Sequence, residues 1–137
     1  MSTQSSTPTL NDLLNRLSRS WLQYIGEAWP WASSERAERL DKFQALVRRQ
    51  KFAAERLAEL LTSRDAVLAL RNYPFDGSTV NYVTLDFVKP RLEADEKAII
   101  AELKAAVYGI QDDPEALRLI EQLTADEEQT LSELSAL

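Results

Sequence analysis

The sequence contains no cysteine and no histidine among its 137 residues. Without cysteine, disulfides, thiolate metal ligands and a cysteine nucleophile are excluded. Without histidine, the chain lacks the commonest general base and the commonest transition-metal ligand. It also has no glycine-rich phosphate loop and no nucleophile elbow. We therefore expect a protein that is not an enzyme and that uses no cofactor.

Glycine and proline are few, with three and five residues, whereas an all-β protein needs many turns. Hydrophobic residues make up 45% and charged residues 28% of the chain, the balance of a globular protein rather than a disordered one. The length fits one domain with its own core. The sequence predicts a single all-α domain over residues 9–137, preceded by a disordered tail over residues 1–8.

The net charge is −6, and this acidic balance argues against nonspecific nucleic-acid binding, which needs a basic surface. No apolar run approaches the ~20 residues of a membrane-spanning helix. The first residues have neither the basic nor the apolar region of a signal peptide. We expect no nucleic acid and no membrane as partner, and by default a cytoplasmic location.

Apolar residues recur at alternating spacings of three and four along four segments, as in amphipathic helices. The first helix is expected to begin near Thr9, which with Asp12 resembles a capping box, and to end before Pro30. The second follows Ser33 and Ser34. The expected buried positions are Leu10, Leu13 or Leu14, Leu17, Trp21, Tyr24 or Ile25 and Ala28 in the first helix, and Leu40, Phe43, Val47, Gln50, Ala54, Leu57 and Leu61 in the second.

The third helix is expected over about residues 84–108, with Gly109 as its C-terminal cap. Pro90 should either bend this helix or define its true start. The fourth helix begins at Asp112 or Asp113, because Pro114 then takes the first helical position. The expected buried positions are Leu85, Val88, Leu92, Ile99, Leu103 and Val107 in the third helix, and Leu117, Ile120, Leu123 or Thr124, Glu127, Leu131 and Leu134 in the fourth.

Polar residues interrupt three of these apolar seams: Gln50 in the second helix, Asp95 or Glu96 in the third, and Glu127 in the fourth. A buried charge without a partner is very costly, so these side chains need one another or further partners. The favoured interpretation is a hydrogen-bonded network, with Tyr24 or Arg49 as additional members, that fixes helix register. The other is a centre that binds one hard cation such as Mg²⁺ or Ca²⁺ through oxygen atoms.

About twenty residues, 64–83, separate the second and third helices. A helix of ~28 residues is ~42 Å long, and twenty partly extended residues reach at most ~66 Å. This crossover can therefore return along the bundle and start the third helix at the opposite end, whereas the other two links are short. Its apolar residues are expected to pack on the bundle: Val67, Leu68, Leu70, Tyr73, Phe75, Val80 and Tyr82. The sequence predicts a four-helix bundle with ferritin-like connectivity.

Two stretches, RRQKFAAERLAELL in the second helix and IEQLTADEEQTLSELSAL in the fourth, are similar to the segments that carry Glu-x-x-His in the ferritin-like superfamily. Together with the helix order and the crossover, they make residues 9–137 resemble bacterioferritins and rubrerythrins. In that family, glutamates and two Glu-x-x-His motifs from four helices bind two metal ions.

Carried over residue by residue, the family's ligand positions fall on Gln50 and Ala53, on Glu93 or Glu96, on Glu127 and Thr130, and on no carboxylate between Leu17 and Trp21. Both histidines are missing and one bridging acid is an amide. The resemblance therefore implies a degenerate site, with Gln50, Glu96 and Glu127 as vestigial core polar positions and no metal expected.

The expected function is that of a non-catalytic structural or protein-interaction module, and the resemblance implies a homodimer. The alternative is a metal-binding or oxidative enzyme of the same superfamily with a carboxylate-only site. A third interpretation is a regulatory bundle that binds a protein partner through Trp29 and Trp31. The basic stretch of residues 48–51 has acidic neighbours at helix-pair spacing and is interpreted as a solvated, salt-bridged face.

Overall fold

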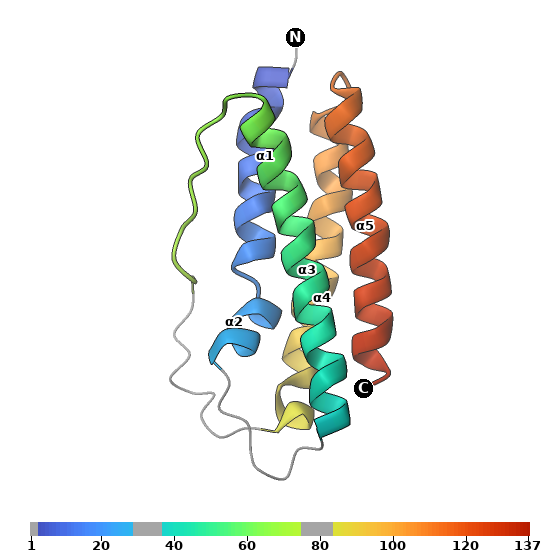
Figure 1. Ribbon diagram of the computed structural model, residues 1–137. Coiled ribbons are helices and arrows are strands. Elements are labelled where there is room, and N and C mark those ends of the chain that lie inside the picture. Colours follow the sequence, from blue (N-terminus) through green and yellow to red (C-terminus); the bar gives the residue numbers. More distant parts are fainter. Residues whose placement is uncertain (1–2, 29–36, 75–83) are drawn as a thin grey trace.

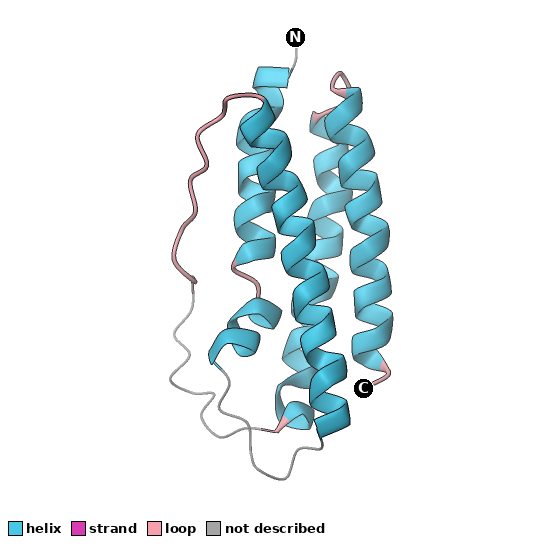
Figure 2. Cartoon of the chain, viewed as in Figure 1, coloured by secondary structure: helices cyan, strands magenta, loops and turns pink. Residues whose placement is uncertain are grey.

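The computed structural model describes residues 3–28, 37–74 and 84–137. These residues form helices and loops without a β-strand, which confirms the all-α class (Figure 2). The elements are α1 (Thr3–Ser18), α2 (Trp21–Ala28), α3 (Ala37–Ser63), α4 (Leu85–Ala106), the 3-10 turn η2 (Val107–Gly109) and α5 (Pro114–Ser135). Every helix in these ranges is too short or too polar to span a lipid bilayer.

The four long helices α1, α3, α4 and α5 lie alongside one another (Figure 1). α3 runs back along α1, and α5 runs back along α4. The described part of the crossover, residues 64–74, leaves the end of α3 and descends beside α1, and α4 then begins at the same end of the molecule as α3. The long connection thus makes α3 and α4 run in the same direction, as the length of the crossover predicted.

The first helix differs from its prediction at both ends. α1 begins at Thr3, so residues 3–8, which were expected to be a disordered tail, are helical. The prediction was wrong because it relied on local composition. Ser6 is fully buried and faces Asp113 at the start of α5, a tertiary contact that no local pattern reveals.

The first helix is also interrupted, because α1 ends at Ser18 and α2 begins at Trp21. The Ser20 hydroxyl accepts a hydrogen bond from the Gln23 backbone N–H at 3.1 Å, and Asp95 of α4 accepts one from the Trp21 N–H at 2.9 Å. These side chains satisfy first-turn N–H groups that a new helix leaves without helical partners. The predicted continuous helix therefore becomes two helices with a break at residues 19–20.

The crossover attaches to α1 through polar contacts. Asn15 donates to the Ala69 carbonyl at 2.7 Å and accepts from the Arg71 N–H at 2.7 Å. Tyr73 is half-buried, with its ring 5.1 Å from that of Tyr24. The expected apolar packing is wrong for three residues, since Val67, Leu68 and Leu70 are exposed. The other three apolar residues of this segment lie outside the described residues: Phe75, Val80 and Tyr82.

The helix starts after the crossover agree with the sequence. The Thr84 hydroxyl accepts from the Phe87 N–H at 3.2 Å, so Pro90 lies within α4 and does not define its start. Gly109 does not act as the expected left-handed cap, since its φ is not positive and α4 gives way to η2 at Val107.

Asp113, and not Asp112, is the N-cap of α5, with Pro114 following it. Its carboxylate accepts from the Ala116 N–H at 3.2 Å and forms two hydrogen bonds with Arg64 at 2.7 and 2.9 Å. The Arg64 guanidinium, together with the other hydrogen bonds to this carboxylate, lowers the pKa of Asp113 to about 2. The pair joins the end of α3 to the start of α5.

Most expected core positions are buried, and several alternatives are now decided. Leu13 and Leu14 are both buried, as are Leu123 and Thr124, and Ile25 is buried where Tyr24 is only partly so. The expected core positions that remain partly exposed are Trp21, Leu40, Val107, Leu117 and Leu131. The Ala28 side chain and residues 29–36, which include Trp29 and Trp31, lie outside the description.

Candidate functional site: a buried polar layer

The apolar core forms two clusters separated by a layer of polar side chains. One cluster contains residues 10–17 of α1 and 53–61 of α3, and the other contains Leu22, Ile25 and residues 43–47. Between them lie buried polar side chains from the start of α2 and from α3, α4 and α5. We call these six residues the central polar layer: Ser20, Gln23, Gln50, Glu96, Glu127 and Thr130. The layer lies at the level where the N-terminal helix is interrupted.

Gln50 is the hub of this layer. Its Nε2 donates hydrogen bonds to Glu96 Oε1 and, at 2.9 Å, to Glu127 Oε1. Its Oε1 accepts from the Ser20 hydroxyl at 2.5 Å and from Gln23 Nε2 at 3.2 Å. A carboxamide offers two N–H donors and two acceptor lone pairs, so the hydrogen-bonding capacity of Gln50 is fully used. Because its oxygen meets two donors and its nitrogen two acceptors, the orientation of the amide is fixed.

Glu96 and Glu127 are 1% and 0% exposed. Burial, followed by the negative charge of Glu127, raises the pKa of Glu96 far above its ordinary value. Burial also raises the pKa of Glu127, and hydrogen bonds from Glu96 and Gln50 oppose this effect. Two carboxyls this close in a dry core do not both ionise at neutral pH, so the pair shares a proton. The shared proton therefore belongs to the pair and not to one of its two members.

Three atoms of the layer have no hydrogen-bonding N–H or hydroxyl partner among the described residues: Glu96 Oε2, Glu127 Oε2 and Thr130 Oγ1. The second oxygen of each carboxyl is thus free for the proton that the pair shares. The Thr130 hydroxyl is fully buried at a position where the family that the sequence resembles has histidine.

The residues present do not fit the two-metal site that the resemblance implies. Gln50 presents N–H groups to both carboxyls, whereas a cation needs an oxygen or nitrogen lone pair at that position. Ala53 is buried but has only a methyl group, and Glu93 is partly exposed and accepts from the Ser135 hydroxyl at 2.6 Å. Within residues 3–28, 37–74 and 84–137, no three acidic, histidine or cysteine side chains gather in a metal-binding arrangement.

The structure decides between the residues that the sequence left open. Glu96 faces the core, while Asp95 lies at the side of α4 and pairs with Arg16 at 2.7 Å. Arg49 lies outside the layer and pairs with Glu133 at 3.0 Å. The Tyr24 ring contacts the Trp21 ring edge-on at 5.8 Å. The hydrogen-bonded core therefore exists, but with partners other than the two that were named for it.

Sequence reasoning missed two members of the layer, Ser20 and Gln23. Both were assigned to a continuous helix, where a polar residue counts as surface. The spacing Ser-x-x-Gln is that of a capping box and was the available signal for a new helix at this point. A second sign is Asp95, which holds the start of α2 through the Trp21 N–H.

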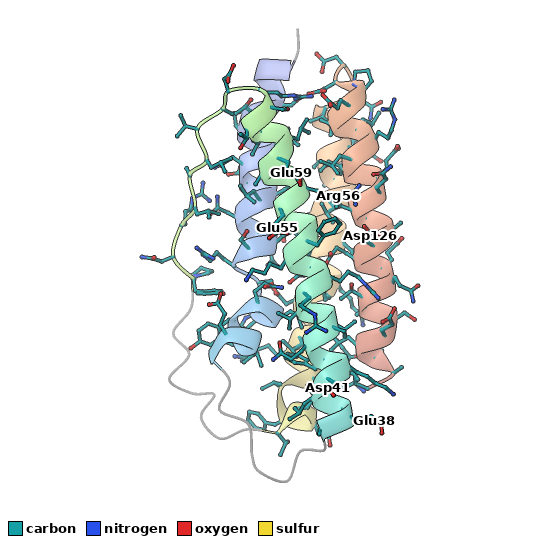
Figure 3. All side chains as sticks on the ribbon, viewed as in Figure 1. Glu38, Asp41, Glu55, Arg56, Glu59 and Asp126 are labelled. Carbon is teal, nitrogen blue, oxygen red and sulfur yellow. The ribbon has the colours of Figure 1, made fainter. Side chains whose placement is uncertain are left out.

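Within the basic stretch of α3, Arg49 forms an ion pair with Glu133 of α5. Figure 3 shows Glu38, Asp41, Glu55 and Glu59 projecting from the outer side of α3. The closest ion pairs of this face join α3 to α4 and α5, and one pair lies within α3: Arg39–Asp86 at 2.5 Å, Arg49–Glu133 at 3.0 Å, Arg56–Asp126 at 3.3 Å and Lys42–Glu38 at 3.5 Å. This face is therefore charge-paired mainly across helices, and the expected pairing within the helix is seen for Lys42 and Glu38.

Comparison of the chain with protein-family models, with curated proteins and with solved structures finds no match.

Proposed function

We propose that this chain is a non-catalytic four-helix bundle with ferritin-like connectivity that serves as a structural or protein-interaction module. The observation that carries the proposal is the Gln50 amide, which donates to Glu96 and Glu127 at the centre of the core. An uncharged hydrogen-bond donor occupies the place between two carboxyls where a metalloprotein would hold a cation. In this proposal the Gln50 amide and the proton that the two carboxyls share take the place of a metal ion.

The helix order and directions support the ferritin-like part of the proposal. Two antiparallel pairs, α1 with α3 and α4 with α5, are joined by one long crossover (Figure 1). This arrangement distinguishes a ferritin-like bundle from an up-down-up-down bundle. The positions that correspond to metal ligands, residues 50, 96 and 127, lie at one level of the core, which is the second support.

A structural role follows from the energetics of the layer. The four hydrogen bonds of Gln50 join α3 to three other parts of the bundle: two go to Ser20 and Gln23 at the start of α2, one to Glu96 of α4 and one to Glu127 of α5. Sliding any helix by one turn moves it ~5.4 Å and leaves these buried groups without partners, which costs about 1–3 kcal/mol each. A buried polar layer of this kind selects one register at the expense of stability.

The experiment is a measurement of metal content in the purified protein, combined with thermal unfolding after addition of Fe²⁺, Mn²⁺ or Mg²⁺. The proposal expects only trace metal, far below one ion per chain. It also expects a melting temperature that does not change when metal is added. Near-stoichiometric metal, or a metal-dependent stabilisation that the Glu127→Gln variant lacks, would support the carboxylate-only metalloprotein instead. Glu121→Gln, the same change on the exposed side of α5, is the matched control.

Self-association is part of the proposal, since the resemblance implies dimers formed along helix faces. Sedimentation equilibrium at several protein concentrations measures it directly. A single species of about 31 kDa, twice the chain mass of 15.5 kDa, is expected. A monomer at all concentrations removes the homodimer and leaves a module that binds a different protein.

A further inference from the structure

The central polar layer lies at the level where the N-terminal helix is interrupted. Its hydrogen bonds connect the acid pair of Glu96 and Glu127 to the short helix α2. α2 has eight residues, far fewer than the ~12–15 that an isolated helix needs to be stable in water. It therefore depends on its contacts with α3 and α4. Its fully buried apolar side chains are Leu22 and Ile25, which are 1% and 0% exposed, and Trp21 and Tyr24 pack partly buried against the same cluster.

Polar contacts hold the first turn of α2. Ser20 and Gln23 both donate to Gln50 Oε1, and Gln23 also donates to the Val47 carbonyl at 2.8 Å. Asp95 accepts from the Trp21 N–H. Since Gln50 is held in turn by Glu96 and Glu127, the position of its amide depends on the state of the acid pair.

Charged side chains of α3, α4 and α5 surround the acid pair. Asp95 of α4 adds negative charge beside Glu96, and Asp126 of α5 adds it beside Glu127. Arg49 of α3 is the cation that opposes them. The groups that face the pair from the α2 side, Ser20 and Gln23, are uncharged. Among residues 3–28, 37–74 and 84–137, the α2 side therefore offers the pair hydrogen bonds but no cation that would compensate a second negative charge.

We propose that the proton shared by Glu96 and Glu127 controls the attachment of α2 to the rest of the bundle. With one proton present, the Gln50 amide bridges an acid and a carboxylate and holds Ser20 and Gln23. When that proton leaves to solvent as pH rises, two carboxylates face each other with only two amide N–H groups between them. Water must then enter, and it does so at the interruption between α1 and α2, where α2 detaches while the apolar cluster of α1 and α3 stays packed.

The proposal rests on the proposed function in one respect, that the layer holds a proton and not a metal ion. It goes beyond that function by assigning the chain a pH-dependent conformational change. The element released carries Trp21, whose ring lies 4.7 Å from the Arg91 guanidinium of α4. The surface presented to a partner would therefore change with pH.

The test is backbone amide hydrogen exchange by NMR between pH 6 and 8 in EDTA, with each rate divided by its intrinsic rate to give an opening constant. Leu22 and Ile25 should open more readily than Leu57 in the apolar cluster, and their opening constants should rise about tenfold per pH unit, because one proton is released on opening. Glu96→Gln should remove this rise and Glu121→Gln should keep it. The proposal would be overturned if Leu22 and Ile25 had the same opening constant as Leu57, or if their opening constants rose less than twofold per pH unit. Either result can be seen in the wild-type protein alone.

Repeating the measurement with Mg²⁺ in place of EDTA separates the two proposals. If Mg²⁺ lowers the opening constants of α2, the layer binds a cation and the proposed function fails. If the pH dependence is absent and Mg²⁺ has no effect, only the proton-dependent attachment fails.

Discussion

Replacing Gln50 by leucine tests whether the central polar layer holds the core together as a unit. Leucine is similar in size but offers no hydrogen bond, so the amide's contacts with Glu96, Glu127, Ser20 and Gln23 are all lost. Ser20 and Gln23 each keep another hydrogen bond, to the Gln23 N–H and the Val47 carbonyl. The Oε1 atoms of Glu96 and Glu127 lose the Gln50 amide, the donor that each of them has.

The magnitude follows from those two oxygens. A buried polar group left without a partner costs about 1–3 kcal/mol, and more when it is charged. Two such groups give a loss of about 4 kcal/mol for Gln50→Leu. This is a large part of the free energy of unfolding of a typical domain, which is about 5–15 kcal/mol. The variant should therefore be folded but close to its limit at room temperature.

The assay is urea unfolding followed by circular dichroism at pH 7, with Gln44→Leu as the matched control. Gln44 lies on α3 as well but is only partly buried, and its replacement should change the free energy of unfolding by less than about 1 kcal/mol. Replacing Gln50, Glu96 and Glu127 together by leucine removes the stranded carboxyls and should recover most of the loss. If Gln50→Leu alone is as stable as the wild type, the layer does not work as a bonded unit and the reasoning fails.

Three further predictions concern the acid pair, the α5 cap and the family resemblance. Because burial raises the folded-state pKa of Glu96, its contribution is complete below the unfolded value of about 4.3 and declines as pH rises, so the free energy of unfolding should fall by about 1.4 kcal/mol per pH unit between pH 5.5 and 8.5. Glu96→Gln should flatten this dependence in urea titrations, and an equal slope in the variant would contradict the assignment. The pKa of Asp113 shifts in the opposite direction, to about 2. Its contribution to the free energy of unfolding is therefore present above the pKa of the unfolded chain and is lost as pH falls toward 2. Asp113→Asn should cost about 1–2 kcal/mol at pH 7 and little at pH 2 in thermal unfolding, and a cost that does not change with pH would refute the ion pair. Finally, the combined change of Gln50→Glu, Ala53→His and Thr130→His restores ligands at buried positions and should raise the melting temperature when Mn²⁺ is added, whereas no metal effect on a folded variant would argue against ferritin-like geometry.

The positions of α4 and α5 could be predicted because each has its own periodicity and a signal at its start. α4 begins next to Thr84, where its apolar pattern starts, and Pro114 takes the first helical position of α5. The polar interruptions at Gln50 and Glu127 were visible for the same reason, since a polar residue on an apolar stripe stands out. These features depend on residues within one turn of each other.

The contacts between helices could not be predicted in the same way. The choice between Asp95 and Glu96 depends on a rotation of about 100° about the helix axis, which only the packing of α4 against α3 and α5 decides. Ser20 has a local capping pattern, but its bond to Gln50 crosses 30 residues. The exposure of Val67 likewise depends on a tertiary contact, because Asn15 of α1 binds the crossover backbone at Ala69 and Arg71 and so fixes which side of the crossover faces solvent.

By itself, the sequence determined that the chain is helical, that the second and third long helices are joined by a crossover, and that histidine and cysteine chemistry is absent. These properties follow from composition, from spacing along a helix and from chain length, which are all local or additive. Only the tertiary structure decided that Gln50 lies between two carboxyls and that α1 and α2 separate at Ser20. The physical reason is that the pKa of a buried acid and the partner of a buried amide are set by atoms from other helices, which meet only when the chain is folded.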